Sequence, residues 1–454
     1  MILNLKSPSL KFSISGLRGI YPIDINPGNL PILANALNHS LPKGPLALAR
    51  DNRPTGKAIE QIVAGTLNAC GRDVHQLGLI PTPTIKAYIN RNELPGGIMI
   101  SASHNPVEYT AFKLIGKQGF FFNQSQNQKF HNMLSLEQNW GSYNRQGKTL
   151  QNAELAISNH IEEVIAKLEL RPVKNLRIAI DCVGAAATVI AERFLRRLSV
   201  QVFSVHNTET DSFPRPPEPV PSSLKKLSQL VIANQCHLGF AFDPDADRLA
   251  IVNAQGKPVG EELTLPLCAM AAFKVRQGDI VVNLSTSFLN QRAADLFGRK
   301  LYRAKVGEAN VVHLMIRKKA AFGGEGNGGV IDPQLFSFGR DSIAGMGWIL
   351  KLLNENPDLD SHIQKLGTTS MIKTSLKAVG QNLPQIFNKV KKEFPEFKVN
   401  EKDGLHLSQK AGLPWIHLRG SNTEPIIRLI VESDRDSTSR SIIKTIEKLL
   451  KHQA

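Results

Sequence analysis

The chain has 454 residues, of which 42% are hydrophobic and 6% aromatic, which is enough for several domains with cores of their own. No apolar run approaches the ~20 residues that a membrane-spanning helix needs, and the residues after Met1 lack the continuous apolar stretch of a signal peptide. The four cysteines show neither C-x-x-C spacing nor the density of a disulfide framework. We therefore expect a protein of the reducing cytoplasm.

The charge of the chain is strongly positive, because 55 Lys and Arg stand against 39 Asp and Glu, a formal net charge of +16. Such an excess is compatible with nucleic acid or an anionic membrane surface as partner. The basic residues are, however, dispersed, for example at 225–226, 317–319 and 389–392, and no zinc-finger or RNP motif is present. We expect no nucleic acid and no membrane partner, but a basic surface that attracts small anions.

The first third of the chain alternates between strand and helix patterns. Residues 46–49 are typical of a strand, 57–70 of a helix and 97–100 of another strand. This β-α-β order predicts a parallel or mixed sheet. A polar stretch at 137–151 has few apolar anchors, and it marks the expected end of the first domain.

A serine segment, Ser101-Ala102-Ser103-His104-Asn105-Pro106, follows the strand predicted at 97–100. Loops commonly carry catalytic groups, so Ser103 is a candidate nucleophile, and Lys113 is a cation suited to a phosphate. Taken alone, the segment equally fits a turn or a helix cap. The G-x-S-x-G elbow of many serine hydrolases is missing. His104 is interpreted as a hydrogen-bonding residue of the loop rather than as a base.

A second α/β unit is expected to start at the strand predicted for 176–181. Ile190, Phe194 and Leu198 follow at helical spacing. The proline-rich segment 213–221 is expected to form a stiff surface loop. The apolar runs 238–242 and 249–252 are typical of buried strands.

Between these two strands lies the acidic segment Asp243-Pro244-Asp245-Ala246-Asp247-Arg248. Three neighbouring carboxylates repel one another unless a cation neutralises them, and alternate residues share one face of an extended segment. Ligands that are all oxygens, in an incomplete shell, favour Mg²⁺. A calcium loop is excluded, because Arg248 and Ala254 stand where that loop needs glycine and glutamate. A solvated acidic turn is the remaining alternative, and the apolar flanks oppose it.

A third unit is expected to start near 255, with its first strand at 280–283. The glycine-dense segment 323–329 allows close backbone approach to a ligand, and Glu325 and Asn327 are its side chains able to hydrogen-bond a sugar hydroxyl or an amine. Apolar residues on both sides of the segment disfavour a flexible linker.

After 366–367 the pattern changes to a strand, a helix, paired strands and an amphipathic terminal helix with Ile442, Ile446 and Leu449 on one face. The segment 419–428 combines two guanidinium groups with hydroxyls, an amide and backbone donors, a set suited to a dianionic phosphate. A turn with arginines pointing to solvent is the alternative.

Together these motifs resemble the α-D-phosphohexomutase family, which includes phosphoglucomutases, phosphomannomutases and phosphoglucosamine mutases. The sugar loop of this family often reads G-E-x-S-G-H, whereas Asn327 and Gly329 stand here in place of the serine and the histidine. The G-E-G-N-G-G form, with Arg340-Asp341 downstream, is most similar to archaeal-type phosphoglucosamine mutases. The resemblance is carried, in chain order, by residues 12–19 with Arg18, 49–54, 101–106 with Lys113, 243–248, 305–307, 325–329 and 419–428.

The resemblance implies a fold of four domains around a central cleft. Three similar α/β domains with mixed sheets are expected at 1–150, 151–254 and 255–366, and a C-terminal α+β domain with a small antiparallel sheet at 367–454. In that order they carry the phosphoserine loop, the metal-binding loop, the sugar-recognition loop and the phosphate-binding loop.

The resemblance also implies an isomerase that moves a phosphate within a hexose or hexosamine phosphate, through phospho-Ser103 and a hexose 1,6-bisphosphate. The expected partner is one small phosphosugar, and the expected assembly is a monomer or homodimer. A phosphoglucomutase/phosphomannomutase is the alternative, followed by a metal-dependent sugar phosphatase, which would release inorganic phosphate. The implied catalytic residues are Ser103, Lys113, Arg18, His104 and Arg248; the Mg²⁺ ligands are Ser103, Asp243, Asp245 and Asp247; and the substrate-binding residues are Lys305, Glu325, Asn327, Arg419, Ser421, Asn422, Thr423 and Arg428.

Overall fold

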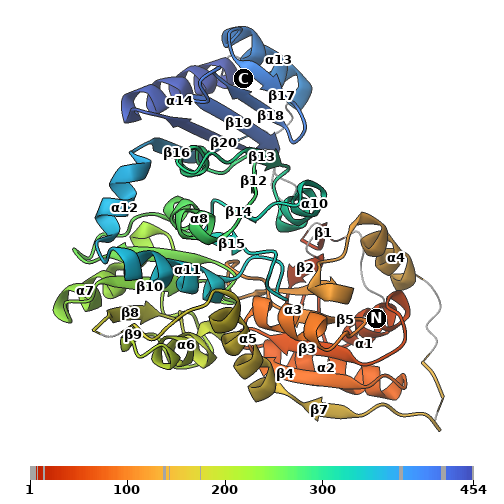
Figure 1. Cartoon of the computed structure of the whole chain (residues 1–454). Helices are drawn as coiled ribbons and strands as arrows, with labels where there is room; N and C mark the ends of the chain where they lie inside the picture. Colours follow the sequence, from red (N-terminus) through yellow and green to blue (C-terminus); the bar gives the residue numbers. More distant parts are fainter. Residues whose placement is uncertain are drawn as a thin grey trace.

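The computed structural model describes residues 7, 9–13, 16–135, 140–142, 144–173, 175–377, 382–420 and 426–451. These residues form four β-sheets that follow one another along the chain (Figure 1). We refer to the segments that carry the four sheets as the first to fourth units. Among the described helices, none combines the length and the apolar character needed to cross a membrane.

The first unit contains a seven-stranded mixed sheet with the order β1-β2-β6-β5-β3-β4-β7. Its central strands are apolar and buried, as is typical of strands in a sheet that is covered on both faces. Proline in the first turn helps α1 and α3 to begin. The elements are β1 (Lys11–Ser13), β2 (Gly16–Ile20), α1 (Leu30–Ser40), β3 (Leu46–Arg50), α2 (Gly56–Ala69), β4 (Val74–Leu79), α3 (Thr82–Arg91), β5 (Gly96–Ile100), β6 (Tyr109–Gly116), α4 (Gln124–Leu134) and β7 (Thr149–Gln151).

The second unit has a four-stranded sheet with the order β11-β10-β8-β9. The helix expected around Phe194 is shorter than its apolar spacing suggests, because a 3-10 turn occupies residues 186–189. The proline-rich segment is only partly a surface loop, since Arg215 is buried and its Nε lies 2.9 Å from Asp181 Oδ2. The elements are α5 (Ala153–Lys167), β8 (Arg177–Asp181), α6 (Ala191–Arg197), β9 (Gln201–Val205), α7 (Lys225–Ala233), β10 (Leu238–Phe242) and β11 (Leu249–Asn253).

The third unit has a four-stranded sheet with the order β13-β12-β14-β15, against which α8 and α11 pack. Apolar residues of these two helices join the largest hydrophobic cluster, which extends into the second unit. The elements are α8 (Thr264–Val275), β12 (Ile280–Asn283), α9 (Leu289–Asp295), β13 (Leu301–Ala304), α10 (Glu308–Lys318), β14 (Phe322–Glu325), β15 (Gly329–Ile331), α11 (Ser342–Glu355) and α12 (Leu359–Leu366).

The fourth unit differs from the other three, as the sequence predicts. Its five strands form an antiparallel sheet with the order β16-β20-β19-β18-β17, and the apolar face of the terminal helix packs into its core through Ile442 and Ile446. In Figure 1 this blue unit lies next to β12 and β13. The elements are β16 (Ser370–Lys377), α13 (Leu383–Glu393), β17 (Lys398–Asn400), β18 (Leu405–Ser408), β19 (Trp415–Gly420), β20 (Ile426–Ser433) and α14 (Asp436–Lys451).

A common strand order relates the first three units. In each, four strands taken in sequence as a, b, c and d lie in the order d-c-a-b: β6-β5-β3-β4, β11-β10-β8-β9 and β15-β14-β12-β13. Strand a is parallel to b and c, whereas c and d form an antiparallel hairpin. The predicted fold class is confirmed, and the repeat is visible in topology although the sequences of the units differ. The boundaries at 150, 254 and 366 stay a prediction.

The repeat also explains where the predicted site residues lie. The connection between strands c and d is the Ser103 segment in the first unit, the acidic segment in the second and the sugar loop in the third. Three equivalent hairpin connections therefore carry three of the predicted site segments.

Candidate active site

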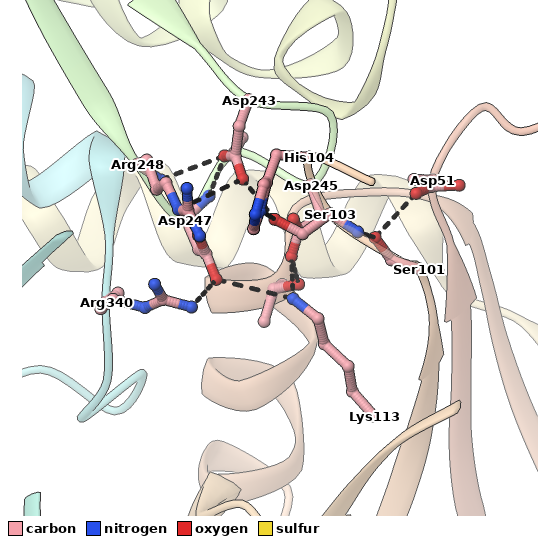
Figure 2. A network of polar contacts seen from close by, with 12 residues as sticks. Asp51, Ser101, Ser103, His104, Lys113, Asp243, Asp245, Asp247, Arg248 and Arg340 are labelled. Atoms are coloured by element: carbon pink, nitrogen blue, oxygen red, sulfur yellow. Dashed lines mark hydrogen bonds and ion pairs between the residues drawn. The ribbon is translucent and has the colours of Figure 1, made fainter. Parts of the chain in front are cut away.

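The Ser103 loop is held in one conformation by a buried arginine. Arg53 donates hydrogen bonds to backbone carbonyl groups within 103–109, at 2.6 to 2.9 Å. Asp51 pairs with Arg53 Nε at 3.2 Å and accepts from the Ser101 hydroxyl at 2.7 Å. Ser103 itself has a left-handed backbone, with φ 51°. These contacts direct Ser103 Oγ at Asp243, to whose Oδ2 it donates at 2.7 Å (Figure 2).

The three aspartates of the metal motif are fully buried and converge. One ligand atom from each of Asp243, Asp245 and Asp247 lies within 4.8 Å of the others. The convergence arises from a tight turn with φ 50° at Ala246, directly after the end of β10. Backbone N–H groups of Asp247 and Arg248 donate to Asp243 Oδ1 at 3.1 and 3.2 Å, which closes the turn.

Basic side chains surround the acidic cluster. Lys113 Nζ lies 2.5 Å from Asp245 Oδ2 and 3.6 Å from Asp247 Oδ2. Arg340 approaches Asp247 Oδ2 to 2.6 Å from the opposite side (Figure 2). Arg248 Nε lies 3.9 Å from both Asp243 and Asp247. The negative charge of the cluster is therefore balanced within the protein.

Burial and neighbouring charges shift the proton affinities in this cluster. Burial, reinforced by the other two aspartates, raises the pKa of Asp243 well above its ordinary value. Burial alone would raise the pKa of Asp245 too, but Lys113 and a hydrogen bond from Thr82 lower it. Arg248 and burial lower the pKa of His104 to about 2. His104 is therefore neutral near pH 7, with Nδ1 3.4 Å from Ser103 Oγ.

The cluster has the donor chemistry of a divalent-cation site. Oδ1 of Asp245 and Oδ1 of Asp247 are buried, and within the described ranges they have no hydrogen-bond partner. Unsatisfied buried carboxylate oxygens are costly, and a hard cation that prefers oxygen ligands would satisfy them. The residues therefore fit the metal that the sequence predicts.

Two adjoining cavities open beside the cluster. The smaller, of about 100 Å³, is lined by the Ser103 loop together with Arg18 and Lys113. The larger, of about 330 Å³, is lined by the sugar loop and by residues of the fourth unit. His104, Arg248 and Arg340 line both. Burial and the nearby Arg53 lower the pKa of Arg18, which indicates an electropositive smaller cavity.

The sugar loop presents its two predicted polar residues in different ways. Glu325 Oε1 accepts hydrogen bonds from Asn283 at 2.8 Å and from the backbone of Gly307 at 2.9 Å. Asn327 lines the larger cavity, and its Oδ1 is buried without a hydrogen-bond partner in the described part of the chain. Lys305 is exposed, and the neighbouring Val306 and Gly307 line the cavity instead. A substrate contact by Lys305 stays a prediction.

The two arginines of the predicted phosphate loop face the larger cavity. Arg419 in β19 and Arg428 in β20 are directly opposite each other in the sheet, and both line the cavity. Arg419 Nε also lies 3.2 Å from Asp403 Oδ1. Ser421, Asn422 and Thr423 lie outside the described residues, so their predicted role stays a prediction.

Sequence reasoning did not assign a function to several residues that contact this site. Thr82, at the start of α3, donates to Asp245, Arg53 holds the Ser103 loop, and Arg340 contacts Asp247. Arg53 and Arg340 lie in segments that carry the family resemblance, but their partners are distant in sequence. Only the folded structure shows those contacts.

Comparison with known proteins agrees with this fold. The family models for α/β/α domains I, II and III of phosphoglucomutase/phosphomannomutase match residues 9–139, 158–256 and 261–369. A probable phosphoglucosamine mutase from Methanopyrus kandleri is 28% identical, over 95% of each chain. A phosphoglucomutase/phosphomannomutase from Thermococcus kodakarensis is 29% identical, over 97% of this chain and 98% of its own. The crystal structure of a family protein from Burkholderia thailandensis has a TM-score of 0.84 at 21% identity, covering 100% of this chain and 99% of the other.

The fold and the matched domains define a phosphosugar mutase, an isomerase that transfers phosphate within a sugar phosphate. The chain belongs to the phosphoglucomutase/phosphomannomutase family, whose domain models account for most of its length.

Proposed function

We propose that the chain interconverts glucosamine 1-phosphate and glucosamine 6-phosphate by way of phospho-Ser103. The observation that carries this proposal is the 2.7 Å contact between Ser103 Oγ and Asp243, at a buried acidic cluster that opens into a cavity with the sugar loop and two arginines. A hydroxyl at that position is suited to accept and return a phosphoryl group.

The proposed cycle is balanced without a further reactant. The bond from phosphorus to Ser103 Oγ breaks while a bond forms to O6 of the sugar 1-phosphate, and the proton of the sugar hydroxyl ends on Ser103 Oγ. The resulting hexosamine 1,6-bisphosphate then reorients in the cavity, so that its 1-phosphate lies beside Ser103. Its 1-phosphoryl group then moves to Ser103 Oγ, whose proton ends on O1, and the 6-phosphate is released.

The residues of the smaller cavity have different roles in the phosphoryl transfer. Arg18, Lys113 and Arg248 supply positive charge beside Ser103, which offsets the charge of the moving phosphoryl group. Lys113 is also placed to move a proton, because it lines the same small cavity as Ser103. Mg²⁺, held by Asp243, Asp245 and Asp247 with phospho-Ser103, would supply further neutralisation when bound. Neutral His104 hydrogen-bonds the serine.

The residues of the larger cavity would hold the rest of the substrate. Arg419 and Arg428 are suited to the phosphate that is not reacting, because guanidinium groups match phosphate geometry. Ser421, Asn422 and Thr423 would complete that site. Glu325 and Asn327 would contact the sugar, with Lys305 at its edge. The four cysteines are free thiols, which supports a cytoplasmic location.

The preference for an amino sugar rests on carboxylates in the larger cavity. Glu218 and Glu325 line it, and a protonated 2-amino group would be attracted to their carboxylates. The name of the Methanopyrus kandleri relative supports the same substrate. The name of the Thermococcus kodakarensis relative supports glucose or mannose phosphates as the alternative.

Coupled assays on the 1-phosphates of glucosamine, glucose and mannose test this proposal. We expect the highest kcat/KM on glucosamine 1-phosphate, with no accumulation of inorganic phosphate. A higher kcat/KM on the neutral sugars would give preference to the alternative. Stoichiometric release of inorganic phosphate would indicate a phosphatase.

Glu325→Gln probes the amino-sugar preference directly. Loss of an ionic partner in a desolvated site costs more than loss of a neutral hydrogen bond. We therefore expect kcat/KM to fall more for glucosamine 1-phosphate than for glucose 1-phosphate, by about tenfold for a difference of about 1.4 kcal/mol. Equal losses on both sugars would show that Glu325 contacts only groups they share.

A further inference from the structure

Arg340 is placed so that each part of its guanidinium group meets a different carboxylate. One terminal nitrogen lies 2.6 Å from Asp247 Oδ2, Nε lies 3.1 Å from Glu308 Oε2, and the other terminal nitrogen lies 3.4 Å from Glu325 Oε2. These partners belong to the acidic turn, the start of α10 and the sugar loop. Arg340 therefore connects the metal motif with the sugar loop.

Glu308 holds the Nε side of Arg340 at 3.1 Å. Its carboxylate also accepts a hydrogen bond from Lys86 of α3 in the first unit. The Lys86 side chain is 1% exposed, and its ammonium group lies 4.6 Å from the centroid of the Phe121 ring. A buried charge that is paired in this way has few alternative positions. Lys86 and Glu308 therefore hold Arg340 in one orientation.

Arg340 has five N–H donors, more than its three carboxylate contacts require, and it borders the space where the substrate would lie. Its side chain is 11% exposed, and the residue lines both the Ser103 cavity and the sugar cavity. Figure 2 shows Arg340 on the side of Asp247 opposite Lys113. A phosphosugar that reaches from Ser103 to Glu325 must pass this guanidinium group.

Arg340 occupies space that a side chain at position 329 of the sugar loop would fill, and residue 329 is glycine. A Cβ atom at this glycine would lie 2.3 Å from Arg340 Cδ and 2.7 Å from Cγ. The backbone of Gly329 is not in the left-handed region, so the close approach of the arginine, not backbone conformation, requires glycine. Gly329, which stands where the family often has histidine, thus makes room for the Arg340 side chain.

We propose that Arg340 is a further substrate-contacting residue, which donates hydrogen bonds to the phosphoryl oxygens at the reacting end of the sugar, and that Glu308 and Lys86 position it. This inference rests on the proposed mutase activity. A guanidinium group presents paired planar donors that match phosphoryl oxygens. It also offsets the repulsion that Asp247 and Glu325 would exert on an anionic substrate.

Arg340→Lys tests the contact, because it keeps the charge and removes the planar fork. Removal of one preorganised donor to a transition state lowers kcat by about 10²–10³-fold, and we expect a loss of that order in kcat/KM. The matched control is Arg276→Lys. Arg276 is also buried and lies 3.0 Å from Asp332 Oδ2, but it is not among the described residues that line these cavities. The control should lower the melting temperature and leave kcat/KM unchanged.

Gly329→Ala separates a substrate contact from a general loss of stability. Alone, it should lower kcat/KM, because the new methyl group displaces Arg340. In the Arg340→Ala background the two atoms closest to the new methyl group, Arg340 Cδ and Cγ, are gone and Asn327 Oδ1, at 3.1 Å, is the remaining one of the three nearest, so the same change should cause a much smaller further loss. Glu308→Gln should lower kcat less than Arg340→Lys, since it removes a support and not the contact. Melting curves confirm that each variant is folded under assay conditions.

The outcomes distinguish this inference from the proposed function. If the wild type shows no mutase turnover, the proposed function fails. If the wild type is active and folded Arg340→Lys and Arg340→Ala both keep near-normal kcat/KM, Arg340 has no substrate contact. Equal losses from Gly329→Ala in both backgrounds would show that the loop, and not Arg340, is what the methyl group disturbs.

Discussion

At the residue scale, the site is a cluster of acidic and basic side chains whose opposite charges stabilise one another. Three buried aspartates would repel one another, and Lys113, Arg248 and Arg340 lie against them. Asp245 Oδ1 and Asp247 Oδ1, which have no hydrogen-bond partner among the described residues, indicate where a cation fits. The charges of the three aspartates are therefore balanced by basic side chains within the protein. A bound cation would take over part of that neutralisation.

Asp245→Asn should weaken the affinity for Mg²⁺ by at least about tenfold, because it removes one carboxylate charge from the cluster. Titration calorimetry measures this without reference to turnover. Asp434→Asn is the control, since Asp434 is an exposed carboxylate that lies 2.8 Å from Arg292 and apart from the cluster. Equal Mg²⁺ affinity in wild type and Asp245→Asn would contradict the ligand assignment.

At the element scale, the repeated hairpin organises the site. Apolar runs predicted strands correctly at 46–49, 97–100, 238–242, 249–252 and 280–283, and the motifs directly after them lie at strand ends as expected. The sequence could not show that three of these connections are equivalent, because the repeat is one of strand order. It also could not assign Arg340, whose partner Asp247 lies 93 residues away. Contacts of that kind depend on packing between units.

Helix α11, which follows Arg340, depends on its N-cap. Asp341 accepts hydrogen bonds from the backbone of Ile343 at 2.9 Å and of Ala344 at 3.1 Å, and it also pairs with His160. Asp341→Ala should lower the free energy of unfolding by more than the ~1 kcal/mol typical of a lost cap, because His160 loses its partner too. Asp341→Asn keeps a capping oxygen and should cost less. Urea denaturation of both variants measures the difference, and equal stabilities would contradict the capping role.

At the scale of the whole molecule, contacts between units hold the site together. Asn52 of the first unit donates to carbonyl groups of Gly184 and Thr210 in the second, at 2.8 and 2.7 Å. Lys373 of the fourth unit lies 2.7 Å from Glu262 of the third. Figure 1 shows the units in sequence along the molecule, with the fourth beside the third. The larger cavity therefore requires the fourth unit to be in place.

His160 of the second unit contacts residues of the first and third units. We expect these contacts to make the stability of the protein depend on pH. The His160 ring contacts Thr84 of α3 at 2.9 Å and Asp341 at 2.9 Å. Burial alone would lower its pKa, but Asp341, with Glu163 nearby, raises it above 6.5. The stabilisation is present below the ordinary pKa of histidine and is lost as the pH rises through the raised value.

We therefore expect the melting temperature to fall as the pH rises above about 6.5, and the fall to be smaller in His160→Gln. Burial raises the pKa of Glu163 as well, which gives a dependence of the same sign, so the variant is needed to separate the two. Identical pH profiles in wild type and variant would contradict the contribution of His160.

The central claim, that Ser103 carries the phosphoryl group, is tested most directly by intact-mass measurement after incubation with glucosamine 1,6-bisphosphate. The wild type should gain the mass of one phosphoryl group, and Ser103→Ala should gain none while keeping its fold and losing nearly all mutase turnover. A phosphorylated Ser103→Ala protein, or one with near-normal turnover, would contradict the proposed cycle.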